Sequence, residues 1–136
     1  MRSGRKRKTL PLRTNRYHRD CRLIDRSEKV RLLPQPDSAD LDLVRVLGAL
    51  ADPVRLELVR ALLGRREPMR CGPDRFDVEI TAATLSHHWK VLRDAGVIST
   101  FASGRNRLVQ VRGDDLDHRF PGLLTAISTE HPAAIR

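Results

Sequence analysis

The chain has 136 residues, enough for one domain, and its 26 Lys and Arg against 17 Asp and Glu give a formal net charge of +9. No stretch approaches the roughly 18 consecutive apolar residues of a membrane span, and no secretory hydrophobic core follows the basic N-terminus, so we expect a cytoplasmic protein without a membrane partner. All of the excess charge lies in residues 1–31, which hold twelve basic and three acidic side chains, and residues 32–136 are neutral overall.

The N-terminal segment has no apolar period that a core could bury, and we predict that residues 1–36 form a basic, disordered arm. Two prolines within residues 32–37 mark its boundary, so the folded domain is expected over 37–131, with 132–136 as a tail. The abrupt change of composition also supports the hypothesis that translation starts later, for example at Val30. Mass spectrometry of the natural N-terminus tests that hypothesis.

The first two helices are predicted from their caps and their apolar spacing. The first begins at Ser38, a favourable N-cap, and has acidic residues in its first turn, where negative charge suits the helix dipole. Its apolar stripe contains Leu43, Val46, Leu47 and Leu50. Asp52 and Pro53 begin a second helix, over residues 53–63. Proline suits the first helical position because the backbone N–H that it lacks would have no partner within the helix there.

The segment 65–80 contains two prolines and a glycine, which argue against a regular helix. We expect at most one helical turn there, followed by a short extended piece over 76–80. A third helix follows over 82–95, capped by Thr81 and ended by Gly96 in the left-handed conformation. The predicted buried side of this helix contains Leu85, His88, Trp89, Leu92 and Ala95.

Two runs of β-forming residues, 97–102 and 107–111, predict a hairpin with residues 103–106 as its loop. Acidic turn residues then lead to a last helix near 120–130, with Pro121 at its start. The order is therefore helix, helix, irregular segment, helix, hairpin and helix. This order predicts a mainly α fold with a small β-hairpin, a winged helix-turn-helix.

The exposed side of the third helix has the chemistry of a helix that enters a DNA major groove by its N-terminus: a small residue for close approach, then hydrogen-bonding and basic groups. Two guanidinium groups at the hairpin tip are suited to phosphates or a minor groove. Residues 81–112 carry a net charge of +4 and the rest of 32–136 carries −4. The candidate DNA-contacting residues are Thr81, Ala83, Thr84, Ser86, His87, Lys90, Arg93, Arg105, Asn106 and Arg107. An ordinary solvated helix face is the alternative interpretation.

Two blocks, LGALADPVRLELVRALL (47–63) and TLSHHWKVLRDAGVISTFASGRNRLVQVR (84–112), resemble the ArsR/SmtB-type winged helix-turn-helix repressors. Together they span a little under half of the chain, and the second is the more specific. The resemblance implies a transcriptional repressor that binds an inverted-repeat DNA operator as a homodimer, pairing through its first and last helices, until an unknown inducer releases it. It also implies a set of DNA-reading and wing residues: Thr84, Ser86, His87, Lys90, Arg105 and Arg107.

The chain departs from the family pattern in two places. Trp89 stands where the family usually has Leu or another medium-sized apolar residue. Residues 65–80 lack the helix that precedes the recognition helix and, with it, the paired-cysteine sensor of the arsenic and cadmium branches. The identity of an inducer therefore cannot be transferred from the family.

Metal control, redox control and catalysis have little support. A thiolate site at Cys71 would need Cys21 or a partner subunit, and an isolated cysteine is more often a packed thiol than a switch. Potential ligands flank the last helix, without the spacing of the family's zinc site: Asp115, Asp117, His118, Glu130 and His131. We interpret these as acidic caps and solvated histidines, and assign no metal, cofactor or catalytic residue. The competing function is an RNA-binding or assembly protein that acts through the basic arm.

Overall fold

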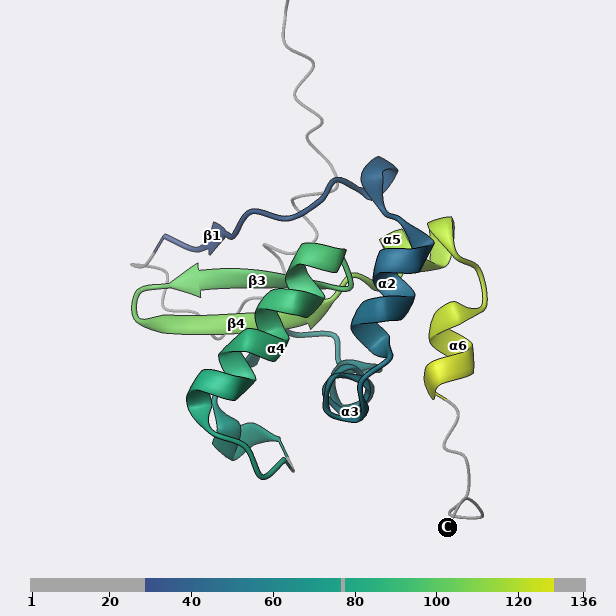
Figure 1. Cartoon of the computed structure of the whole chain (residues 1–136). Helices are drawn as coiled ribbons and strands as arrows, with labels where there is room; N and C mark the ends of the chain where they lie inside the picture. Colours follow the sequence, from purple (N-terminus) through teal and green to yellow (C-terminus); the bar gives the residue numbers. More distant parts are fainter. Residues whose placement is uncertain (1–28, 77, 129–136) are drawn as a thin grey trace, which may run out of the picture.

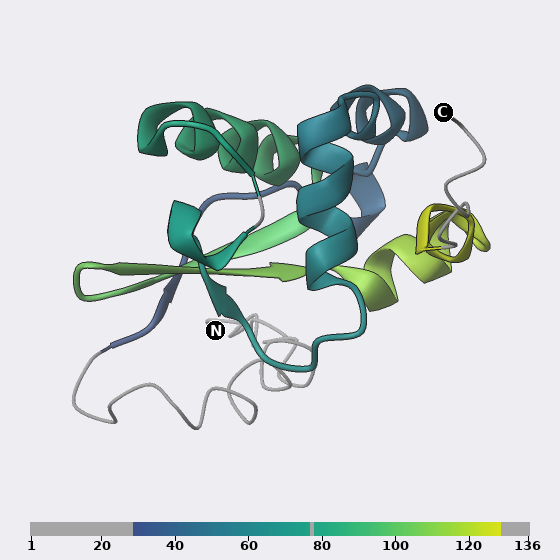
Figure 2. The same ribbon diagram turned by 90° about the horizontal axis from the view of Figure 1, so that it is seen from below.

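The computed structural model describes residues 29–76 and 78–128, and there a set of helices covers one face of a small antiparallel sheet (Figures 1 and 2). In chain order the elements are β1 (Arg31–Leu32), η1 (Ser38–Asp40), α2 (Leu43–Leu50), α3 (Pro53–Leu62), β2 (Met69–Arg70), η2 (Pro73–Arg75), α4 (Ala82–Ala95), β3 (Ile98–Ser103), β4 (Asn106–Val111), α5 (Gly113–Arg119) and α6 (Leu123–Ser128), where η denotes a 3-10 helix. The mainly α class with a small sheet is confirmed. No helix in the described ranges is long and apolar enough to cross a membrane.

The start of the first helix differs from the prediction. Ser38 opens only the 3-10 turn η1, and α2 begins at Leu43, where the Asp42 side chain accepts a hydrogen bond from the Val44 backbone N–H at 3.0 Å. Leu41, between the two elements, has an extended backbone and a buried side chain. A continuous helix from Ser38 would move this side chain out of the core, which explains why Asp42 is the cap.

The second helix and the segment after it follow the prediction with one addition. Asp52 caps α3 by accepting from the Arg55 N–H at 3.0 Å, and the helix ends at Leu62. The segment 65–80 contains a single 3-10 turn, η2, and no regular helix among its described residues. The addition is the two-residue strand β2, which pairs with β4, whereas the described residues of 76–80 are in no strand.

Helix α4 has the predicted bounds because local signals define both of its ends. The Thr81 side chain accepts from the Thr84 N–H at 3.2 Å, and Gly96 ends the helix with a φ of +86°. Leu85, Trp89, Leu92 and Ala95 are buried as predicted, and His88 is half-buried. The core continues from this face of α4 to α2, α3 and the sheet, through residues such as Val46, Leu58 and Val109.

The hairpin turn is tighter than predicted. Strands β3 and β4 extend to the pair Ser103 and Asn106, which leaves Gly104 and Arg105 as a two-residue turn. Gly104 has a φ of +56°, which a turn with glycine at its first central position requires. The wing is therefore a hairpin of regular strands up to its tip.

Strand β1 moves the start of the folded part earlier than Asp37. Arg31 and Leu32 pair antiparallel with Ala102 and Phe101 of β3, so the sheet has four strands in the order β1-β3-β4-β2. Residues 31–36 were predicted to belong to the arm because two of them, Pro34 and Pro36, mark a boundary of the chain. Backbone pairing with a distant strand overrides that local signal. The rest of the predicted arm, through residue 28, and the tail 132–136 lie outside the described residues.

The C-terminal part contains two helices where one was predicted. The acidic stretch that we interpreted as a turn is helix α5, with two acids in its first turn and Leu116 fully buried. Pro121 and Gly122, with a φ of +88°, separate it from α6. Acids favour a helix N-terminus as well as a turn, which is why composition alone did not separate the two.

Candidate nucleic-acid interface

The N-terminal half of α4 presents a continuous exposed face. Ala83, Ser86 and His87 are exposed, as are Thr81 and Thr84. The two threonine hydroxyls lie 3.0 Å apart and belong to the helix cap. These five side chains, all predicted to contact DNA, therefore lie on the solvent side at the N-terminal end of α4.

The basic residues of α4 differ in their surroundings. Lys90 is exposed and forms an ion pair of 2.5 Å with Asp94, one turn further along the helix. Arg93 is half-buried, and the positive charges of Arg93 and Arg107 both act on the Cys71 thiol. Helix and wing thus bring guanidinium groups to the same neighbourhood.

The wing carries the other predicted cations. Arg105 lies in the turn, and Asn106 and Arg107 are the first residues of β4. All three are exposed, and the Arg107 guanidinium makes one long hydrogen bond of 3.4 Å, to the carbonyl of Asn106. These side chains keep most of their donor capacity toward solvent.

Arg112 does not belong to this surface, although it was counted in the +4 of residues 81–112. Its side chain is 3% exposed and bonds to Asp115 through Nε at 3.1 Å and Nη2 at 3.0 Å. Its Nη1 donates to the carbonyl oxygen of Pro36 at 2.7 Å. This charge is neutralised inside the domain and supplies nothing to the exposed face.

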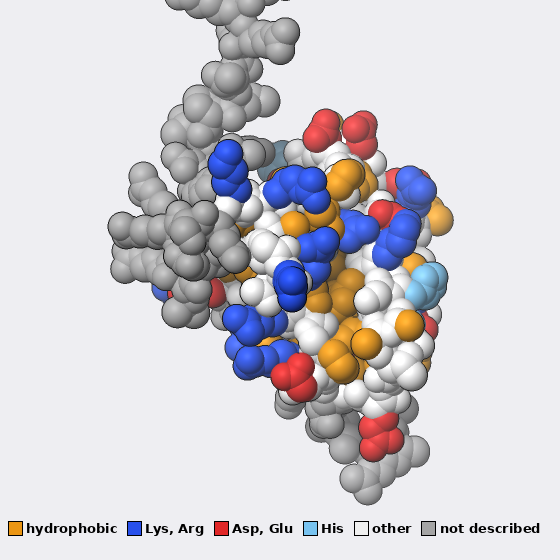
Figure 3. Space-filling view, turned by 90° about the vertical axis from the view of Figure 1, so that its left-hand side faces the viewer, with side chains coloured by type: hydrophobic (Ala, Val, Ile, Leu, Met, Phe, Trp, Pro, Cys, Tyr) orange, Lys and Arg blue, Asp and Glu red, His pale blue; other side chains and the backbone are white. Residues whose placement is uncertain are grey.

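Three other arginines, which the sequence analysis did not assign, are exposed where Arg112 is not. Arg31 on β1, Arg70 on β2 and Arg75 on η2 are all exposed. Only strand pairing brings Arg31 and Arg70 to the wing, and strands of two residues leave no periodic pattern in a sequence. Figure 3 views the side of the molecule that bears the hairpin turn; Lys and Arg side chains occupy its middle, and acidic side chains lie mainly toward its margins.

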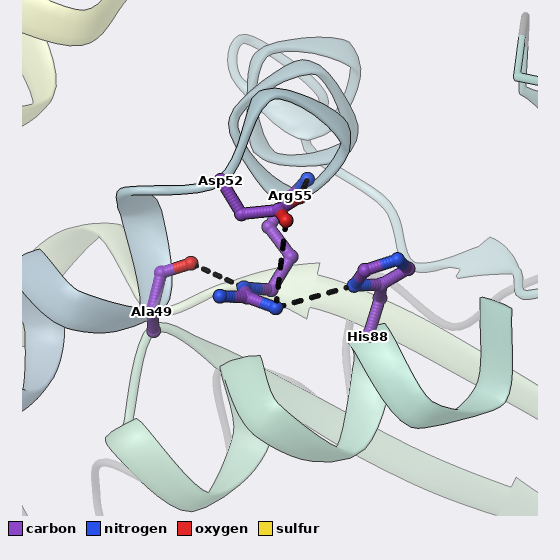
Figure 4. Close-up of polar contacts among 4 residues, drawn as sticks. All are labelled: Ala49, Asp52, Arg55 and His88. Carbon is purple, nitrogen blue, oxygen red and sulfur yellow. Dashed lines mark hydrogen bonds and ion pairs between the residues drawn. The ribbon is translucent and has the colours of Figure 1, made fainter. Parts of the chain in front are cut away.

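Arg55 fixes the position of α4 relative to the two preceding helices (Figure 4). Its Nε donates to the Ala49 carbonyl at 2.6 Å, and its Nη1 lies 3.3 Å from Nδ1 of His88 on α4. Asp52 adds an ion pair of 3.9 Å, and the hydrogen bond from the Arg55 N–H is the main reason why the pKa of Asp52 lies below its ordinary value. The sequence analysis named Arg55 only as part of a family block.

Trp89 and Cys71 support α4 from beneath. The Trp89 ring meets Phe76 edge to face with centroids 5.1 Å apart, and its Nε1 donates to the Cys71 carbonyl at 3.3 Å. Burial raises the pKa of the Cys71 thiol to about 11. A thiol with this pKa is almost fully protonated at neutral pH, so Cys71 has the properties of a packed thiol.

The described residues contain no group of three or more His, Cys, Asp and Glu arranged to hold a metal ion. Asp115 is engaged with Arg112, and Asp117 and His118 are exposed on α5. The other ligands considered, Cys21, Glu130 and His131, lie outside the described residues.

Comparisons with known proteins found a helix-turn-helix family model and two HTH-type transcriptional regulators. A family model described as a helix-turn-helix domain matches residues 50–100. The uncharacterized HTH-type transcriptional regulator YceK of Bacillus subtilis is 31% identical over 83 residues, which are 61% of this chain and 83% of that protein. The HTH-type transcriptional repressor SmtB of Mycobacterium tuberculosis is 36% identical over 74 residues, 54% of this chain and 53% of SmtB, so the match spans about half of that repressor.

Proposed function

Because the chain belongs to the ArsR/SmtB-type family of winged helix-turn-helix transcriptional regulators, we propose that it is a repressor that binds an inverted-repeat operator as a homodimer until an inducer releases it. DNA-binding regulation is the general activity of this family. Repression, the form of the operator, the dimer and the inducer are the proposed part.

The observation that carries this proposal is the pairing of an exposed α4 N-terminus with a cationic wing. A helix that enters the major groove by its N-terminus needs small and hydrogen-bonding side chains there, and α4 exposes Ala83, Thr84, Ser86 and His87. Phosphate contacts need exposed cations beside it, which the wing supplies. We assign DNA contacts to Thr81, Ala83, Thr84, Ser86, His87, Lys90, Arg93, Arg105, Asn106 and Arg107.

An exposed apolar face on α2 supports the homodimer. Leu43, Val44 and Leu47 lie in the first two turns of α2 and are 43%, 76% and 46% exposed. Contiguous exposed apolar side chains of this kind mark interaction surfaces. A two-fold dimer presents two copies of α4 to the DNA, and this symmetry is the reason for expecting an inverted repeat.

The test of the DNA surface removes two wing cations, in the double variant Arg105→Ala/Arg107→Ala. Operator duplexes come from selection of bound DNA in a random or genomic pool, and affinity is measured by fluorescence anisotropy at several salt concentrations. The matched control is Arg65→Ala/Arg66→Ala, which removes the same charge from exposed residues between α3 and β2.

We expect the wing variant to bind more weakly and to lower the slope of log K against log salt by about 0.9 for each phosphate that the variant no longer neutralises. The control should keep the parental slope. Equal affinity and slope in the wing variant and the parent would contradict the proposed surface. Metals and small molecules are then screened for release of the bound operator.

A further inference from the structure

We propose that the β1 edge of the sheet is a further DNA-binding element, in which Lys29 and Arg31 bind backbone phosphates of the operator beside those bound by the wing. The inference rests on the proposed function, because it extends the surface that reads the operator. It is carried by the register of β1, by the sheet face on which Arg31 lies and by the hydrogen bonds that hold the strand in place.

Arg31 lies in a row of residues that runs across the sheet. It pairs with Ala102 of β3, and Ala102 pairs with Arg107 of β4. On the other side of Arg107, the N–H of Cys71, directly after β2, donates to the Arg107 carbonyl at 3.1 Å. Neighbouring strands are about 4.8 Å apart, so the backbones at Arg31 and Arg107 are about 10 Å apart. The row therefore carries one arginine on the wing and another on the edge of the sheet.

This row lies on the face of the sheet that the helices cover. Side chains alternate along a strand, and Val109, two residues after Arg107, is fully buried in the core that the sheet shares with the helices. At the β2 end of the row, the positive charges of Arg107 and of Arg93 on α4 both act on the Cys71 thiol. The same row thus meets α4 at one end and reaches Arg31 at the other.

The two basic side chains of the β1 edge are available to a partner. Lys29 and Arg31 are exposed, and neither side chain forms an ion pair or hydrogen bond within residues 29–76 and 78–128. Because β1 is antiparallel to β3, the chain traced backward from Arg31 runs toward the hairpin turn, as Figures 1 and 2 both show. Lys29 therefore extends the charged edge toward the turn that carries Arg105.

Strand β1 is held in place before any DNA arrives. The Leu33 N–H, directly after the strand, donates to the Thr100 carbonyl at 2.9 Å. Further along, the buried Arg112 guanidinium donates to the Pro36 carbonyl at 2.7 Å, and Asp115 holds that guanidinium through two of its nitrogens. A positioned strand loses little conformational freedom on binding, so its cations can add to affinity.

The phosphates of duplex DNA are the ligand that this arrangement favours. Arg31 shares its row and its sheet face with the wing cation Arg107, and exposed Arg and Lys side chains bind phosphates without regard to base sequence. The separation of the two backbones suits contacts with two different phosphates. Charged side chains on an edge strand also prevent sheets from associating edge to edge, and this alternative role predicts a different response to substitution.

The first experiment neutralises the edge in the full-length protein, in the double variant Lys29→Gln/Arg31→Gln. The matched control Lys29→Arg/Arg31→Lys keeps both charges. A second control, Arg65→Gln/Arg66→Gln, removes the same charge from exposed residues between α3 and β2. Each protein is titrated with the selected operator duplex at several salt concentrations, and its urea midpoint and sedimentation are measured without DNA.

We expect the edge variant to bind the operator at least about fivefold more weakly at 0.1 M salt. The slope of log K against log salt should be lower by up to about 1.8 per protomer, or about 0.9 for each phosphate contact that is lost. Both controls should keep the parental affinity and slope. The urea midpoint of the edge variant should equal that of the parent, because both side chains are exposed.

Three results would overturn the inference. If the edge variant keeps the parental affinity and slope, Lys29 and Arg31 do not contact DNA, and the proposed function stands on α4 and the wing. If the edge variant keeps its affinity and associates in sedimentation, the two charges protect the sheet edge. If the parent binds no duplex selectively, the proposed function fails and the inference fails with it.

A second experiment identifies the phosphates that Arg31 contacts. Neutral methylphosphonate linkages replace the operator phosphates one at a time, and each duplex is titrated with the parent, Arg31→Gln and Arg107→Gln. A linkage that weakens the parent should have no effect on the variant that lacks its cation, and the two variants should become insensitive to different linkages. The inference is wrong if Arg31→Gln responds to every linkage as the parent does.

Discussion

A substitution at Arg112 tests whether this residue stabilises the fold or contacts DNA. The sequence analysis counted its charge with the DNA-contacting segment 81–112, whereas the structure buries it in an ion pair with Asp115. The variant Arg112→Ala removes both bonds to Asp115 and the donor to the Pro36 carbonyl. Breaking a buried ion pair typically costs about 3–5 kcal/mol. Because Asp115 retains 22% exposure and water can reach it, we expect a lower cost here, about 2–4 kcal/mol.

The assay is urea unfolding followed by circular dichroism, at one protein concentration because the proposed dimer makes stability concentration-dependent. For a domain of this size with an m-value of about 1.5 kcal/mol/M, a loss of about 3 kcal/mol lowers the urea midpoint by about 2 M. The control is Arg107→Ala, an exposed arginine on the wing, which should keep the midpoint and weaken DNA binding. The reasoning is refuted if Arg112→Ala keeps the parental midpoint and loses affinity for the operator.

Four further predictions concern single residues. Gly96→Ala should lower stability by about 2 kcal/mol or more in thermal melts, because its φ is +86° and a Cβ there would overlap the Leu41 side chain; an unchanged melting temperature would contradict this. The pKa of Cys71 is raised from 9.0 to about 11, so at neutral pH its thiol should react with iodoacetamide about 100-fold more slowly in the folded protein than in urea. The rates are measured in a Cys21→Ser variant, and equal rates would disprove the shift. The pKa of Asp52 is lowered by folding, so its contribution to stability is complete above its ordinary pKa of 3.8 and is lost as the pH falls through the lower folded value. Between pH 7 and pH 3 the urea midpoint should therefore fall further for the parent than for Asp52→Asn. Val44→Glu, on the exposed face of α2, should shift sedimentation from dimer to monomer without unfolding the chain.

Predictions from the sequence succeeded where the cause is local. The ends of α4 depend on a threonine cap and a left-handed glycine within the helix itself, so Thr81 and Gly96 were identified correctly. The cap of α3 at Asp52 is of the same kind. Strands β1 and β2 were missed because two residues carry no periodicity, and only their pairing with β3 and β4 creates them.

Charge counting failed for a related reason. A sequence gives the number of cations in a segment, and the energetic role of each one depends on which groups it meets. Arg112 meets Asp115 inside the domain, and Lys90 meets Asp94 on the surface of α4. Arg31 is far from the recognition helix in the sequence, and strand pairing brings it to the wing. The local charge of +4 was a correct sum over residues that do not share one surface.

The two departures from the family pattern are best understood as one change. A winged helix-turn-helix normally supports its recognition helix on a preceding helix, and here residues 65–80 provide only the 3-10 turn η2 within the part of the chain that the structure describes. Trp89 compensates for this loss, because its large ring reaches Phe76 at the end of that turn and its Nε1 binds the Cys71 carbonyl just before it. A leucine would provide neither the edge-to-face packing nor the hydrogen bond. The irregular segment and the tryptophan therefore depend on each other, and together they support α4 from beneath.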